Sequence, residues 1–226
     1  MKGNMIHFQI NGQSCPAYLS SSLKGKGPGI IVIQEYWGLV DHIKKVTDRF
    51  AEAGFTALAP DFYLGQKAEK PDDAGRLMMA LNIDQAEKIV RGAVDALLAQ
   101  DSTQGDKLGV VGFCMGGQLS LYAASINPKI GACVDYYGVH PNVTPKLENL
   151  QAPVLGFFAE HDAHVTPSVV QNLSQKLTAL GKKHDFVTYP NIHHAFFNET
   201  RPDVYHQPSA EDSWKKMIDF FKKQLM

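Results

Sequence analysis

The 226-residue chain has no long apolar segment and no excess of charge of one sign. Its apolar runs, such as Gly29 to Ile33, are far shorter than the roughly 20 residues that cross a bilayer. The first residues, Met1 to Met5, precede a predicted strand rather than an apolar signal core, so we expect neither export nor a membrane partner. With 22 Lys and Arg against 23 Asp and Glu, the formal net charge is −1. This balance gives no electrostatic reason to expect nucleic acid as a partner.

Cysteine is scarce, with three widely spaced residues. An odd number at such spacing fits a reducing compartment, so we expect a cytoplasmic protein. Cys15 and Cys133 lie in predicted strands and are interpreted as small core residues. His161, His164, His193 and His194 could suggest a metal site, but none of them form the i, i+4 pair of a zinc hydrolase motif. We therefore expect neither a metal nor a cofactor.

Strand and helix patterns alternate along the chain after an opening hairpin. Asn11-Gly12, a strong tight-turn signal, separates strands predicted at 5–10 and 14–19. Further strands are expected at 29–34, 55–59, 108–111, 130–136, 154–159 and 186–189. Helices are expected at 41–53, 84–98, 118–125, 168–180 and 210–224, and one more is expected to run through Met79. We predict one α/β domain over 1–226, with a mostly parallel central sheet, helices on both faces and an N-terminal antiparallel hairpin.

A Gly-x-Cys-x-Gly pattern, centred on Cys114, joins the strand at 108–111 to the following helix. This is the pattern of the nucleophile elbow of α/β-hydrolases, with cysteine where serine is usual. Side chains at Gly112 or Gly116 would collide with neighbouring backbone in so sharp a turn. The sulfur would stand at a helix N-terminus, where the dipole and free amides favour a thiolate and a developing oxyanion. The alternative is a buried structural cysteine in a tight turn.

Two candidate partners of Cys114 follow it along the chain, an acid and then a histidine, and each lies just after a predicted strand. The order nucleophile, acid, histidine is that of α/β-hydrolases. Asp162 follows the strand at 154–159, and His194 follows the strand at 186–189. A cysteine needs a base to take its proton, and a carboxylate on the far nitrogen of that base fixes its tautomer. Each residue alone could be an ordinary loop residue. Together they favour a triad of Cys114, Asp162 and His194.

Nearly the whole chain resembles the dienelactone hydrolase family. The motifs that carry the likeness are Gln34-Glu35-Tyr36-Trp37-Gly38, Ala59-Pro60-Asp61-Phe62-Tyr63, Gly112-Phe113-Cys114-Met115-Gly116-Gly117, Tyr136-Tyr137-Gly138, Asp162 near Pro167, and His194-Ala195-Phe196. The resemblance implies an α/β-hydrolase fold and hydrolysis of a small-molecule ester or lactone through a thioester on Cys114. It indicates His194 rather than the adjacent His193 as the base.

The same resemblance implies three supporting roles. The amides of Tyr36 and Met115 would form the oxyanion hole, and Glu35 would sit beside the sulfur and hold the resting thiol. The alternative for Glu35 is a strand-end glutamate paired with a surface lysine. Aromatic residues in loops near the expected mouth suggest a largely apolar substrate pocket. The pocket residues that we expect are Trp37, Tyr63, Tyr137, Phe196 and Asn198.

The chain departs from the family at two positions. Members that act on dienelactone grip its carboxylate with two arginines, and this chain has Pro71 and Asn198 at those places. Arg76 and Arg201 lie nearby but are offset. Because a carboxylate usually needs a guanidinium at a fixed place, we expect neutral esters and lactones to be better substrates than dienelactone.

The protein is expected to be a monomer or a homodimer. Two other functions remain possible besides that of a dienelactone-type hydrolase. One is a general short-chain carboxylesterase of another physiological role. The other is a ligand-binding or thiol redox-sensing protein that keeps the triad without turnover.

Overall fold

The computed structural model describes residues 2–226, so Met1, the first residue of the expected 1–226 domain, lies outside it. An eight-stranded sheet has the order β1-β2-β4-β3-β5-β6-β7-β8. The strands are β1 (Asn4–Ile10), β2 (Gln13–Ser20), β3 (Gly27–Ile33), β4 (Thr56–Pro60), β5 (Thr103–Phe113), β6 (Ile130–Tyr136), β7 (Val154–Ala159) and β8 (His184–Tyr189). β1 and β2 form the predicted antiparallel hairpin, β2 is antiparallel to β4, and all later pairings are parallel. The predicted fold class is confirmed.

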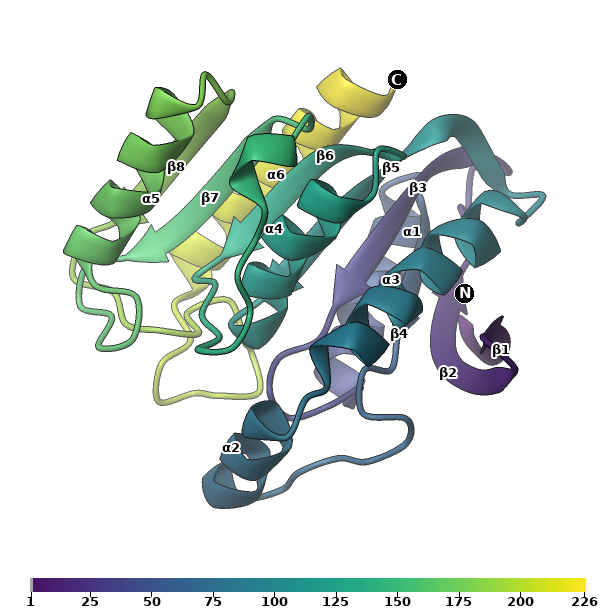
Figure 1. Ribbon diagram of the computed structural model, residues 1–226, viewed down its shortest axis with the longest axis horizontal. Coiled ribbons are helices and arrows are strands. Elements are labelled where there is room, and N and C mark those ends of the chain that lie inside the picture. Colours follow the sequence, from purple (N-terminus) through teal and green to yellow (C-terminus); the bar gives the residue numbers. More distant parts are fainter. Residues whose placement is uncertain (1) are drawn as a thin grey trace.

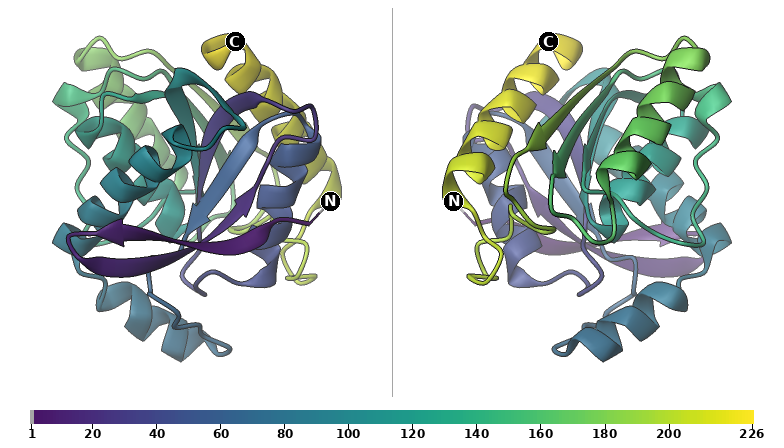
Figure 2. Two further views of the ribbon diagram at one scale, coloured as in Figure 1. Left: turned by 90° about the vertical axis from the view of Figure 1, so that its right-hand side faces the viewer. Right: turned by 90° about the vertical axis from the view of Figure 1, so that its left-hand side faces the viewer.

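Helices cover both faces of the sheet (Figure 1). One face carries α3 (Ile83–Leu98), α4 (Met115–Ile126) and α5 (Pro167–Ala179), and the other carries α1 (Asp41–Glu52) and α6 (Gln207–Leu225). The short α2 (Pro71–Met79) stands away from the body, beyond the carboxyl ends of the strands (Figure 2). None of the helices within residues 2–226 combines the length and the apolar character needed to span a membrane.

The helix after the elbow begins earlier than the sequence predicts. α4 starts at Met115, directly after Cys114, whereas the prediction placed its start at 118. The two glycines at its start are poor helix formers, and this weakened the sequence signal. They are needed there because of close packing. A Cβ at Gly116 would lie 2.4 Å from the carbonyl oxygen of Ile33, and one at Gly117 would lie 2.3 Å from Oδ1 of Asp135.

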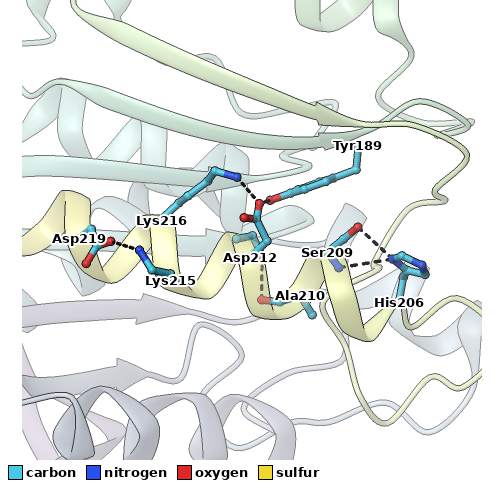
Figure 3. Close-up of polar contacts among 9 residues, drawn as sticks. Tyr189, His206, Ser209, Ala210, Asp212, Lys215, Lys216 and Asp219 are labelled. Carbon is cyan, nitrogen blue, oxygen red and sulfur yellow. Dashed lines mark hydrogen bonds and ion pairs between the residues drawn. The ribbon is translucent and has the colours of Figure 1, made fainter.

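The last helix is fastened to the edge of the sheet (Figure 3). The hydroxyl of Tyr189, the last residue of β8, donates a hydrogen bond of 2.6 Å to Oδ2 of Asp212 on α6, and Lys216 pairs with the same carboxylate. At the start of α6, the side chain of His206 accepts a hydrogen bond from the amide of Ser209 and caps the helix. These contacts hold the end of the strand that leads into the loop carrying the candidate base.

Candidate active site

Cys114 occupies a strained turn between β5 and α4. Its backbone has φ of 54° and ψ of −118°, a conformation that costs a non-glycine residue about 1–3 kcal/mol. Hydrogen bonds hold it there: its amide donates to Tyr136 O (3.0 Å), and its carbonyl accepts from Gly117 (2.9 Å) and Val139 (3.1 Å). A Cβ at Gly112 would lie 1.8 Å from the oxygen of Gly116, which confirms the predicted steric role of these glycines. The turn places the thiol in a cleft, at the N-terminus of α4.

Asp162 and His194 meet across the loops that follow β7 and β8. Nδ1 of His194 lies 2.6 Å from Oδ2 of Asp162. Oδ1 of Asp162 accepts hydrogen bonds from the amides of His164 (2.7 Å) and Val165 (2.9 Å), so the carboxylate is held from both sides. Burial pushes the pKa of Asp162 upward, but His194 and the two amides outweigh it and keep this pKa below its usual value. The acid is therefore ionised at neutral pH and oriented toward the imidazole.

The His194 ring has Asp162 on one side and Cys114 on the other. Burial lowers the pKa of His194, yet Asp162 and the Cys114 thiol together outweigh it and raise this pKa to about 10. The direction of this shift means that Asp162 and the sulfur stabilise the imidazolium, the form that the ring takes once it has accepted the thiol proton. No hydrogen bond of ordinary geometry joins Cys114 to the ring in the described chain, and such catalytic contacts often tighten only when substrate binds. The ring of Tyr137 packs against the imidazole with 4.9 Å between centroids.

Glu35 is buried at the end of β3 and lines the same cleft. Its Oε2 accepts a 2.6 Å hydrogen bond from Nδ2 of Asn198, while Oε1 has no hydrogen-bond partner within residues 2–226. Burial raises the pKa of Glu35 above its ordinary value, against the opposing effects of Asn198, His194 and Arg201. The alternative of a glutamate paired with a surface lysine is wrong, because this side chain is 2% exposed and bonded to an amide.

Two backbone amides beside the thiol are free. Met115 is the first residue of α4, so its N–H has no partner inside the helix. Tyr36 follows Glu35 in the loop after β3, and its N–H donates to no backbone oxygen of the described chain. Free amides at a helix N-terminus suit a negatively charged oxygen. The assignment of these two amides to an oxyanion hole stays a prediction.

The cleft above Cys114 has a volume of about 630 Å³. Its lining includes the apolar side chains of Trp37, Met78 and Val139, together with four histidines and the Arg201–Asp203 pair. Of residues 2–226, no group of three His, Cys, Asp or Glu is placed to hold a metal ion. A groove of similar size, about 650 Å³, lies against the carboxyl-terminal end of α4 and shares no residue with this cleft.

Only one of the five expected pocket residues, Trp37, lines the cleft. Tyr63 is buried, with its hydroxyl donating to Sδ of Met115 at 3.1 Å, and Tyr137 and Phe196 are fully buried in the aromatic core. Asn198 lies behind Glu35 and supports it. The expectation that these four side chains line the cleft is therefore wrong, because large rings gain more by packing inward than by facing solvent.

The two offset arginines have different positions. Arg76 is exposed on α2, pairs with Asp73 and does not line the cleft. Arg201 does line it, three residues beyond Asn198. Sequence reasoning missed this contribution, and that of its partner Asp203, because no local pattern shows that the loop after the histidine folds back over the cleft.

Comparison with known proteins agrees with this site and fold. The model of the dienelactone hydrolase family matches residues 15–225. The chain belongs to the dienelactone hydrolase family. It is 40% identical to "Protein usf" of Aquifex pyrophilus and 34% identical to the "Putative carboxymethylenebutenolidase" of Aquifex aeolicus (strain VF5), with 99% of each chain covered in both comparisons.

A solved structure supports the same assignment. The crystal structure of the "Putative Dienelactone Hydrolase" from Klebsiella pneumoniae superposes with a TM-score of 0.86 at 28% identity, covering 98% of this chain and 99% of that one. As a member of the dienelactone hydrolase family, the protein is a hydrolase with the α/β-hydrolase fold.

Proposed function

We propose that this dienelactone hydrolase family member cleaves carboxylic esters or lactones through a thioester on Cys114, with His194 as base and Asp162 as its orienting acid. The observation that carries the proposal is the 2.6 Å contact between His194 and a buried, ionised Asp162, beside a cysteine held at positive φ. A strained cysteine and an oriented histidine in one cleft match the requirements of nucleophilic catalysis.

In the proposed reaction, His194 takes the proton of the Cys114 thiol through its Nε2, because Nδ1 is engaged by Asp162. The thiolate attacks the carbonyl carbon of the ester, and the amides of Tyr36 and Met115 stabilise the oxyanion that forms. The intermediate collapses to a thioester while His194 protonates the departing alcohol oxygen. Water, deprotonated by His194, then attacks the thioester, and Cys114 leaves as the thiolate.

Glu35 has a supporting role in this proposal. Burial raises its pKa and so stabilises its neutral form, and a neutral carboxyl can donate a hydrogen bond from Oε1 to a nearby sulfur. We assign to Glu35 the task of holding the resting thiol, with Asn198 fixing its orientation through the 2.6 Å bond to Oε2. An ionised Glu35 would disfavour the thiolate through repulsion between like charges.

We assign a small neutral ester or lactone as the substrate. The cleft is lined by apolar side chains and histidine rings, and its guanidinium is already paired with Asp203. The scarcity and spacing of the cysteines favour the cytoplasm as the place of action.

The test is steady-state turnover of 4-nitrophenyl acetate in large excess over enzyme. The proposal expects many turnovers per active site and a loss of roughly a thousandfold or more in Cys114→Ala. The matched control is Cys15→Ala, which removes a buried thiol in β2 that does not line the cleft, and it should retain activity. A single stoichiometric reaction without further product would instead indicate a thiol sensor, and full activity in Cys114→Ala would exclude the thioester.

A further inference from the structure

Arg201 is the single lysine or arginine among the described residues that line the catalytic cleft. One edge of its guanidinium, Nε and Nη2, is engaged by a neighbour in the same loop. Nε donates to Oδ1 of Asp203 at 3.0 Å, and Nη2 donates to Oδ2 at 2.6 Å. Asp203 lines the cleft too. The pair is the two-pronged arrangement that a guanidinium makes with any carboxylate, and here the protein supplies that carboxylate itself.

The pair is close to the reacting centre. Arg201 lies within electrostatic reach of Glu35 and Tyr36, since it lowers the pKa of the first and has its own pKa raised by both, after the larger effect of Asp203. A substrate carboxylate bound to Arg201 would therefore lie in the same cleft as Cys114, on the side of Glu35 and Tyr36.

The loop that carries the pair is held by its own hydrogen bonds. The amide of Arg201 donates to Asn198 O (3.0 Å), and its carbonyl accepts from Val204 (3.0 Å) and Tyr205 (2.8 Å). Asn198 is itself fixed to Glu35. Asp203 thus stays two residues from Arg201 in an ordered turn, and an external carboxylate must displace a tethered competitor.

Among the described residues that line the cleft, no second lysine or arginine is available to an anionic ligand. Asp72, from α2, lines it as well, so the fixed charges near the mouth are two carboxylates and one guanidinium already in use. A carboxylate that enters loses hydration without gaining an ion pair, which is unfavourable for binding.

We propose that Asp203 is a specificity-determining residue: by occupying Arg201, it makes the cleft discriminate against carboxylate-bearing esters in favour of neutral ones. The inference rests on the proposed esterase function. Removal of the Asp203 carboxylate leaves Arg201 free, and the same cleft then accepts an anionic ester.

The test uses two substrates with the same phenyl acetate group, 4-acetoxybenzoate, which carries a carboxylate, and its neutral methyl ester, methyl 4-acetoxybenzoate. Cleavage of the acetyl ester is followed by the absorbance of the released phenol. The measured quantity is the ratio of kcat/KM for the anionic ester to kcat/KM for the neutral ester. Wild type should give a ratio below one. Asp203→Asn should raise the ratio at least tenfold, mainly through a lower KM for the anion.

Two further variants separate the ion pair from general charge. Asp72→Asn removes one negative charge from the same cleft without freeing a guanidinium, and it should change the ratio less than threefold. Arg201→Gln combined with Asp203→Asn should return the ratio to the wild-type range. Equal shifts in Asp72→Asn and Asp203→Asn, a gain that survives loss of Arg201, or a wild-type ratio above one would each overturn the proposal. If wild type hydrolysed neither ester, the proposed function itself would fail.

Discussion

A buried carboxyl group behind the elbow, that of Asp135, should make the free energy of unfolding depend on pH. Asp135, near the end of β6, is 1% exposed, and neither of its side-chain oxygens has a hydrogen-bond partner of ordinary geometry within residues 2–226. Its Oδ1 sits in a notch between Gly117 and Gly138, where a Cβ on either glycine would lie 2.3 Å away. Burial raises the pKa of Asp135 from 3.8 to about 7, although the amide of Gly138 opposes the shift. Asp135→Asn keeps the shape but cannot ionise.

The size of the effect follows from the difference in pKa between folded and unfolded chain. A shift of about three units, at about 1.36 kcal/mol per unit, corresponds to about 4 kcal/mol. The folded state holds this proton more tightly, so the stabilisation is complete below about pH 4 and is lost as pH rises to about 7. Roughly two thirds of the loss, about 3 kcal/mol, falls between pH 5 and pH 8.5.

The assay is urea unfolding of wild type and Asp135→Asn at pH 5 and pH 8.5. Other titrations are common to both proteins and cancel, so the variant should gain about 3 kcal/mol relative to wild type between the two pH values. Asp106→Asn, at an exposed position, is the matched control and should show no such gain. A difference between wild type and Asp135→Asn that is the same at both pH values would refute the reasoning.

Two further predictions concern the residues around the sulfur. Glu35→Gln should raise the rate of iodoacetamide inactivation, and the gain over wild type should grow with pH. The reason is that wild-type Glu35 becomes charged above its raised pKa and then disfavours the thiolate. If the ratio of the two inactivation rates, variant to wild type, did not vary with pH, this role would be contradicted. His194→Ala should lose roughly a thousandfold or more in kcat, as Cys114→Ala does, and Asp162→Asn should retain more, since the imidazole is still present. His193→Ala, the neighbouring control, should lose less than tenfold, and activity retained in His194→Ala would overturn the assignment of the base.

Local sequence signals were sufficient for the framework of the molecule. Backbone conformation depends mainly on residues close in sequence at the turn of Asn11-Gly12, in the apolar strands and at the two elbow glycines. These features could therefore be predicted from short segments. The approach of Asp162 to His194 was predictable as well, because parallel strands bring their carboxyl ends to one edge of the sheet.

The walls of the cleft were not predictable in this way. Whether Tyr63 and Phe196 face the cleft or the core depends on side-chain packing between segments far apart in sequence, and both pack inward. The path of the loop from Asn198 to Tyr205 is set by its own turns and by the bond to Glu35, and these contacts bring Arg201 and Asp203 over the cleft. The strand-end position of Glu35 likewise gave no sign that Asn198 would be its partner.

The most direct measurement of the central claim is mass spectrometry of enzyme quenched in acid during turnover of 4-nitrophenyl butyrate. The account predicts a butyryl group on the peptide that contains Cys114, released by neutral hydroxylamine as expected for a thioester, and absent in Cys114→Ala. Acylation of a serine, lysine or other residue in its place, or steady turnover with no acyl group on Cys114 even when deacylation is slowed by low temperature, would contradict it.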